Sequence, residues 1–473
     1  MKARISVSDS MELKLRESVD SLQIAAQLES DGMTDAQANG RHGIPTVFDL
    51  ARQMRRQVPA KPTAAPKPVG PWQTRPGRHV LRGVLFALPA ACYLAVAEKV
   101  TGPAGGTVVI ASLLLAWAVS QAVAYLGYVR LGQLDRDGAK AVLRRGLLGP
   151  GLLVVAVSAG LAVALRVTPA VALIAVAQAA YLLAASVALV LEAERALLLT
   201  LAPGVVGNVV AVVVGDGRLF DATAPGAALA GLVAAACAAA TVLATIGLAV
   251  RLTAGSRTGR WPAGRDLGGA AEQAAHGLVA AGLLVFIPTA GRLLDEVGAG
   301  TPSGLTAVTG GVVLLPLAVS MGFAEWLLYR YRAAAHDALH QRSTLRAFRN
   351  WSAGALMVVL AAYLVVVAAL SAACAGLTAL LSGDVPPADA LIAAGALGGA
   401  FFLALLLMAC GVRHVAVLSG AAALATECLV AALGSRAGYR VDVTALQFAV
   451  AAGLTLVLLA YALVVLTRAT QHR

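Results

Sequence analysis

From Val80 onward the sequence contains about twelve apolar stretches, and this feature constrains the fold more than any other. A helix needs about 20 mainly apolar residues to cross a bilayer, and each stretch is long enough to do so. Because 59% of all residues are hydrophobic and only 13% are charged, the chain cannot be divided into ordinary soluble domains. We therefore predict an all-α polytopic membrane protein with about 12 transmembrane helices. The stretches lie near 80–98, 105–128, 147–165, 169–191, 196–215, 225–250, 271–290, 303–328, 353–381, 388–410, 412–434 and 444–467.

The positions of the basic residues indicate which side of the membrane each connection occupies. Short cytoplasmic loops of membrane proteins carry an excess of Lys and Arg. With the N terminus inside, 18 of the 37 Lys and Arg residues fall on inner loops or the C-terminal end, and six fall outside. The other 13 lie at or before Arg82. We therefore expect a multi-pass protein of the cell membrane with both termini in the cytoplasm, and we interpret the net charge of +12 as a record of this topology.

Residues 1–79 contain no stretch that could span a bilayer. Within residues 1–58 the sequence predicts a cytoplasmic module of three short helices. They cover Leu13 to Leu28, a second segment that Thr34 or Asp35 caps, and a third that begins near Ile44-Pro45-Thr46 and runs through Arg56. Prolines are frequent in residues 59–79, which favours a semi-rigid tether.

The membrane part shows signs of an internal duplication with an offset of about 200 residues. Gly105-Gly106-Thr107-Val108-Val109 opens the second stretch, and Gly310-Gly311-Val312-Val313 opens the eighth. We therefore predict a first six-helix lobe at residues 80–250, a cytoplasmic linker at 251–270 and a second lobe at 271–473. Because six is an even number, both lobes enter the membrane from the same side and form parallel repeats. Hydropathy alone could also impose such regularity.

Two six-helix halves, a basic segment after the second helix of each half, and a proline in the first helix of each (Pro89 and Pro288) are together similar to one superfamily. The chain resembles the multidrug/oligosaccharidyl-lipid/polysaccharide exporters, which include the MATE drug exporters and the polysaccharide flippases. The resemblance rests on topology over residues 80–468. It implies a cavity between the lobes, access that alternates between the two sides, and no counterpart for the N-terminal segment.

Ionisable side chains inside a bilayer are costly, and each is therefore a candidate for the substrate or ion path. The deepest are His276, Glu325 and Glu427. Uncharged polar candidates are Gln121, Tyr125, Gln178 and Asn208. The offset of the duplication places Gln121 at nearly the depth of Glu325, so these two could face each other across the cavity.

Each candidate also has a purely structural interpretation. Glu325 could pair with Arg330 or Arg332 at the inner rim, and Glu427 with Arg413 or an amide. His276, Gln178 and Asn208 could join helices by hydrogen bonds.

The basic segments 129–145 and 330–350 are expected to lie along the inner leaflet, with their arginines facing anionic head groups. In this interpretation Leu131, Leu134, Val142 and Leu143 face lipid. The same segments would suit an anionic lipid-linked substrate. The lack of a Lys or Arg in the middle of the membrane weighs against a lipid-pyrophosphate as that substrate.

The sequence contains no arrangement typical of a catalytic, cofactor or metal site. It has no phosphate-binding GxxxxGK[ST] loop and no HExxH zinc motif, and its five cysteines are scattered singly. We therefore expect no enzyme activity, no cofactor and no metal.

Three functions remain open on this basis. The first is a secondary transporter or flippase that exports a polysaccharide or lipid-linked oligosaccharide. The alternatives are a cation- or proton-coupled multidrug exporter, and a membrane-anchored scaffold that docks a cytoplasmic protein through residues 1–58. Acidic residues balance basic ones in that module, so we do not expect it to bind nucleic acid.

Overall fold

The computed structural model describes residues 21–57, 76–93, 100, 102–214, 227–255, 264–296, 307–341, 344–382 and 385–468. The chain forms two compact units, residues 1–73 and 74–473. The first part of the predicted module, most of the predicted tether 59–79 and the middle of the predicted linker 251–270 lie outside the described residues. The regular elements of the described residues are helices, which confirms the predicted all-α class.

The described part of the first unit consists of three helices, α2 (Ser21–Ser30), α3 (Asp35–His42) and α4 (Val47–Gln57). A capping box begins α3: the backbone N–H of Gln37 donates to the Thr34 hydroxyl, and the Gln37 side chain accepts from the Thr34 N–H. Gly43 ends the helix in the left-handed conformation that glycine adopts at low cost. The helices bury a small apolar core of Ile24, Ala25, Leu28, Ala38, Ile44, Val47, Leu50, Ala51 and Met54.

Replacing Thr34 by Ala should loosen α3 locally. The substitution removes the hydroxyl that accepts from Gln37, and loss of such a cap costs about 0.5–2 kcal/mol. Hydrogen exchange of the intact protein, read by mass spectrometry, should show faster exchange over residues 35–42 and unchanged exchange in α6. Unchanged protection in α3 would contradict this role of the cap.

The second unit is a bundle of helices that match the predicted apolar stretches. The first six are α5 (Pro76–Tyr93), α6 (Gly102–Gly132), α7 (Arg136–Gly146) continued through the π-helix η2 (Leu147–Gly151) into α8 (Leu152–Ala164), α9 (Pro169–Val190), α10 (Glu194–Val214) and α11 (Ala227–Leu252). The second six are α12 (Gly264–Glu296), α13 (Ala307–Gln341), α14 (Leu345–Ser382), α15 (Ala388–Ala409), α16 (Arg413–Arg436) and α17 (Val443–Val465).

Eleven of these helices in the described residues are long and apolar enough to cross a membrane, when α7, η2 and α8 are taken as one continuous helix. The twelfth helix is α5, which packs against α10, α11 and α13. Pro150 lies in η2, where a proline that lacks an N–H donor is compatible with a locally wider turn. The chain is therefore a multi-pass membrane protein, as predicted.

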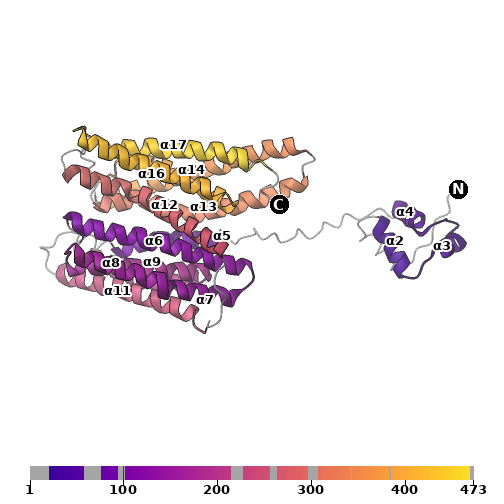
Figure 1. The fold of residues 1–473 in the computed structure, drawn as a ribbon, viewed down its shortest axis with the longest axis horizontal. Helices are drawn as coiled ribbons and strands as arrows, with labels where there is room; N and C mark the ends of the chain where they lie inside the picture. Colours follow the sequence, from indigo (N-terminus) through magenta and orange to yellow (C-terminus); the bar gives the residue numbers. More distant parts are fainter. Residues whose placement is uncertain are drawn as a thin grey trace. The chain divides into compact units, whose positions relative to one another are not determined.

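The helices divide into two lobes in the order of the sequence. Among α5–α11 the closest packing is between α10 and α11 and between α6 and α9, and among α12–α17 it is between α15 and α17 and between α13 and α14. Figure 1 shows α6, α8, α9 and α11 grouped together, and α13, α14, α16 and α17 grouped on the other side of the bundle. This is the predicted pair of six-helix repeats.

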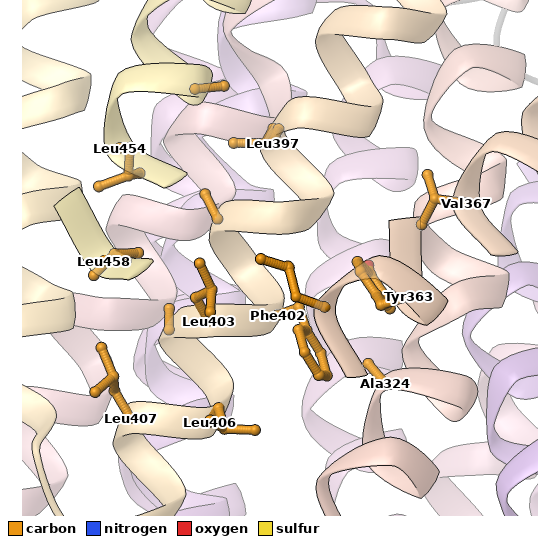
Figure 2. Close-up of a cluster of buried hydrophobic side chains, with 14 of the residues drawn as sticks. Ala324, Tyr363, Val367, Leu397, Phe402, Leu403, Leu406, Leu407, Leu454 and Leu458 are labelled. Atoms are coloured by element: carbon orange, nitrogen blue, oxygen red, sulfur yellow. The ribbon is translucent and has the colours of Figure 1, made fainter. Parts of the chain in front are cut away.

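The second lobe is organised around α15, which has more buried positions in the described residues than the helices around it. Figure 2 shows Leu397, Phe402, Leu403, Leu406 and Leu407 of this helix in the apolar core. Phe402 stacks on Tyr363 of α14 with ring centroids 4.8 Å apart, and Leu403 is fully buried. The Tyr363 hydroxyl lies 3.0 Å from the Ser320 hydroxyl of α13, which satisfies a polar group inside the core. Large apolar side chains such as Leu173, Leu199 and Leu380 remain exposed on the outside of the bundle, as a lipid-facing surface requires.

The basic segments differ from the predicted surface helices. The helix α13 continues through Arg330 to Gln341, and the segment after α6 belongs to α7, which is continuous with the next membrane helix. Leu134 is 94% exposed, whereas Val142 and Leu143 are buried in the first lobe. The prediction that Val142 and Leu143 face lipid was therefore wrong, because one face of the segment packs against the neighbouring helices.

Candidate functional site

The two lobes contact each other at two helix crossings, α5 with α13 and α6 with α12. At the first crossing glycines allow the backbones to approach closely. A Cβ atom at Gly83 would lie 2.5 Å from the carbonyl oxygen of Val319, and one at Gly322 would collide with the carbonyl oxygen of His79. Small residues at such positions are typical of tightly packed membrane helices. We call this contact the α5/α13 crossing.

Charged side chains surround the α5/α13 crossing. Arg82 of α5 donates through Nη1 to Glu325 of α13 and through Nε to Glu194 of α10, the latter at 3.0 Å. Arg78 donates to the same Glu194 oxygen at 2.9 Å and also pairs with Glu192 at 3.0 Å. His79 Nδ1 lies 3.4 Å from the second oxygen of Glu325. One arginine of the first lobe is therefore shared between a carboxylate of its own lobe and a carboxylate of the other.

This network is largely shielded from solvent. The side chains of Arg82, Glu194 and Glu325 are 12%, 7% and 19% exposed. Charge-assisted hydrogen bonds in such surroundings are stronger than surface ion pairs, and removing one partner leaves the other charge uncompensated. The network therefore joins the lobes in the arrangement that the structure records.

The second crossing, which we call the α6/α12 crossing, is packed by neutral groups. A Cβ atom at Gly277 would lie 2.9 Å from the Gln121 side chain and 3.4 Å from the Ala118 Cα atom. A Cβ atom at Gly269 would collide with the ring of Tyr125. Arg413, at the start of α16, donates to the Tyr125 hydroxyl at 3.0 Å and lies 4.7 Å from its ring centroid. Arg413 adds one cationic contact at the edge of this crossing.

Glu427 lies apart from both crossings, inside the second lobe. It is fully buried on a face of α16 that otherwise consists of small residues, Ala416, Gly420, Ala423 and Ala431. Neither carboxyl oxygen has a hydrogen-bond partner within the described residues. The alternative ion pair with Arg413 is not formed, because Arg413 contacts Tyr125.

A second buried polar group of the same lobe, Gln447 of α17, also has an unsatisfied atom within the described part of the chain. A Cβ atom at Gly434 of α16 would collide with Val441, which lies just before α17. Gln447 is 2% exposed, and its amide nitrogen donates to the Leu283 carbonyl of α12 at 2.7 Å. Its Oε1 atom is also a buried acceptor without a partner in the described residues.

Three other candidates occupy separate positions. Gln178 donates to the Val109 carbonyl at 3.3 Å and joins α9 to α6. Asn208 donates to the Cys92 and Gly204 carbonyls at 3.2 and 2.8 Å and joins α10 to α5. His276 is half-buried on α12. The arrangement thus gives Gln178 and Asn208 the helix-joining contacts that the structural interpretation expects.

The structure places Gln121 and Glu325 at the two different crossings, Gln121 against α12 and Glu325 against α5. The partner of Glu325 is Arg82, which lies 243 residues earlier in the chain, and the paired groups nearby are Arg78, His79 and Glu194. Sequence reasoning did not identify Arg78, Arg82 or Glu194. Their charges at the edges of the first and fifth predicted stretches were the only available signal.

The described residues contain no group of three or more His, Cys, Asp or Glu side chains that could hold a metal ion. Three polar features of the described bundle are candidates for a functional role: the ion network between the lobes, the Tyr125–Arg413 contact and the buried Glu427. An unpaired buried carboxyl group can bind and release a cation or proton, and an ion network between two lobes can stabilise one of their arrangements.

Comparison with solved structures identifies the architecture. The chain is similar to an outward-facing multidrug resistance MATE family transporter of the MOP superfamily, with a TM-score of 0.51 and 14% identity over 84% of this chain and 97% of that one. It is also similar to a MATE protein in the bent conformation, with a TM-score of 0.50 and 12% identity over 84% and 97%. No protein-family model and no curated protein sequence matches the chain. The chain therefore has the fold of the MATE transporters of the MOP superfamily.

Proposed function

We propose that this protein is a secondary exporter that works by alternating access and couples transport to protons through Glu427. The transporter fold supports the first part of the proposal. Glu427 carries the second part, because it is fully buried and its oxygens have no hydrogen-bond partner in the described residues. An ionised carboxylate in such a place is costly, so the group is expected to hold a proton in this arrangement.

The position of Glu427 supports a coupling role. Its helix α16 packs against both α12 and α17, and the Gln447 side chain of α17 offers a buried acceptor oxygen that has no partner in the described residues. If the lobes rearrange and admit water to this junction, the proton can leave and the carboxylate becomes hydrated. Binding and release of the proton would then accompany the change between the two arrangements, as coupled transport requires.

Purified protein in proteoliposomes tests the proposal directly. An imposed proton gradient should drive accumulation of a transported cationic dye, and a trapped pH indicator should report proton movement in the opposite direction. Dye transport that is indifferent to the gradient would rule out proton coupling. Absence of transport for a panel of lipophilic cations would indicate that the protein carries a different class of substrate.

A polysaccharide or lipid-linked oligosaccharide is the second candidate for that cargo. The observation that favours it is a set of exposed arginines on the two lobes, which would attract an anionic head group to the inner mouth. The exposed arginines of the predicted inner segments are Arg136, Arg144, Arg195, Arg251, Arg265, Arg330, Arg346, Arg349 and Arg468. A deletion strain should then accumulate a lipid-linked glycan, whereas an exporter of small cations would leave glycan levels unchanged.

We further propose that the module in residues 1–58 docks a cytoplasmic protein. It has a core of its own and lies in a unit separate from the bundle. Deleting residues 1–73 removes that unit but preserves Arg78 and Arg82 of the ion network. Transport in proteoliposomes should remain near the wild-type rate, while recruitment of a partner in cells is lost. A large loss of transport in the purified truncated protein would contradict the separation of these roles.

A further inference from the structure

The two crossings between the lobes occupy equivalent positions in the duplicated fold. Ala118 of α6 approaches Gly277 of α12, and at an offset of 204 residues Gly322 of α13 approaches the His79 and Gly83 backbone of α5. The same offset relates Gln121 to Glu325 and Tyr125 to Tyr329. Each crossing thus pairs the first helix of one lobe with the second helix of the other.

The equivalent crossings differ in chemistry. At the α5/α13 crossing, an arginine meets a glutamate from the opposite lobe. At the α6/α12 crossing, Gln121 is equivalent to Glu325. When the first helices of the two lobes are aligned on His79 and His276, Val279 is equivalent to Arg82. A Cβ atom at Gly277 would lie against the aliphatic part of Gln121, and Val279 contacts Gly420 of its own lobe. Both crossings are closely packed through small residues, but among the described residues only the α5/α13 crossing also carries an ion pair between the lobes.

These two kinds of contact respond differently to separation of the lobes. A charged pair can be exchanged for hydration, so its cost of opening is partly offset by water once water enters. Both crossings lose dispersion contacts when the helices part, but the neutral α6/α12 crossing gains nothing comparable from water. The charged crossing is therefore the one suited to open, and the neutral crossing is the one suited to stay closed.

Glu194 gives Arg82 a second partner that belongs to its own lobe. When Glu325 leaves, the bond from Arg82 Nε to Glu194 can persist at 3.0 Å, and Arg78 continues to share the same oxygen. Arg82 would therefore not be left as an uncompensated charge in the membrane. The first lobe is built so that its half of the contact remains satisfied after release.

We propose that the lobes separate asymmetrically, with Arg82 and Glu325 acting as a latch at the α5/α13 crossing and the α6/α12 crossing acting as the pivot. This inference rests on the alternating access proposed above, since only a transport cycle would require the lobes to part. It goes beyond that proposal by naming which of two equivalent crossings opens and which residue pair controls it.

Distances between spin labels on the two lobes test the proposal. In a background without the five native cysteines, labels at Leu199 of α10 and Ala334 of α13 report on the latch side, and labels at Arg136 and Leu267 of α12 report on the pivot side. All four positions are exposed in the described structure. The distances between the labels are measured by pulsed electron–electron double resonance on the protein in lipid nanodiscs.

Replacing Glu325 by Gln should add a longer distance on the latch side and leave the pivot distance unchanged. The ratio of separated to closed molecules should rise about tenfold, the change expected when one charge-assisted hydrogen bond is lost. R82Q removes the other partner and should give the same result. E272Q makes the same chemical change on the exposed surface of α12 and should leave both distances as in the wild type.

Two results would overturn the proposal: unchanged latch distances in both E325Q and R82Q, or equal widening on the two sides. Monodisperse gel filtration of each variant shows that it has folded. The outcome is separate from that of the proposed function. Unchanged latch distances together with intact proton-driven transport would contradict only the latch proposal. Opening of the latch without any transport would contradict only the proposed transport function.

Discussion

Replacing Glu427 by Gln is expected to abolish proton-driven transport. The amide has nearly the shape of a protonated carboxyl group but cannot release a proton, so the variant is fixed in the neutral form. Because Glu427 is fully buried and unpartnered in the described structure, the neutral amide should be tolerated without loss of folding. Proton-driven accumulation of a cationic dye in proteoliposomes should fall to the level of protein-free vesicles.

Exchange of dye across the membrane without a gradient distinguishes loss of coupling from loss of the whole transporter. E427Q should retain this exchange, since it needs movement of the lobes but no net proton transfer. E272Q is the matched control, because Glu272 is an exposed carboxylate on α12 and its loss should leave proton-driven transport intact. A wild-type rate of proton-driven transport in E427Q would refute a coupling role for this carboxyl group.

The second large effect is expected at Gly322. Even an alanine there would bring its Cβ atom into collision with the His79 carbonyl oxygen and to 2.7 Å from the Gly83 backbone nitrogen. Backbone atoms of α5 cannot rotate away as a side chain can, so α5 and α13 must move apart. We expect about 1–3 kcal/mol of destabilisation, which is the usual cost of overpacking. The apparent melting temperature of the detergent-solubilised protein should fall clearly.

Gly354 provides the matched control for Gly322. It lies inside α14, and a Cβ atom added there would have no neighbour within 4 Å. Because Ala is about 1 kcal/mol more favourable than Gly inside a helix, G354A should keep or raise the melting temperature. If G322A melted like the wild type, the close backbone contact between α5 and α13 would not be a stabilising feature of the bundle.

The membrane helices could be predicted from the sequence because their signal is local. A stretch of about 20 apolar residues has few alternatives to a spanning helix, since every backbone group must be hydrogen-bonded within the bilayer. The predicted stretch 169–191 corresponds to α9, Pro169–Val190, and the predicted stretch 388–410 to α15, Ala388–Ala409. Capping signals worked for the same reason in the first unit, where Thr34 begins α3.

The boundaries failed where polar sequence continued a helix beyond the apolar stretch. The stretch predicted at 353–381 corresponds to α14, which begins at Leu345, and α13 extends to Gln341. Buried contacts support these extensions: Tyr331 is 1% exposed and bonds to Ser352, whose hydroxyl also donates to the Leu466 carbonyl. Such contacts join three distant parts of the chain and leave no periodic signal in any one of them.

Partners of the polar residues could not be predicted either, even where the residues themselves were identified. Glu325 was a candidate with Arg330 or Arg332 as its expected partner, because these arginines are nearby in the sequence. Arg332 instead donates to the Ala409 carbonyl of α15, and Glu325 pairs with Arg82 of the other lobe. Likewise Arg413, the expected partner of Glu427, donates to the Tyr125 hydroxyl.

The sequence by itself determined that the chain is a twelve-helix membrane protein built from two halves, because hydropathy and repeated spacing are properties of the order of residues. Only the tertiary structure decided that Arg82 meets Glu325, that Gln121 packs against Gly277, and that Glu427 has no hydrogen-bond partner in the described residues. The physical reason is that the free-energy cost of a buried charge depends on the groups that surround it. Here those groups come from helices far apart in the chain.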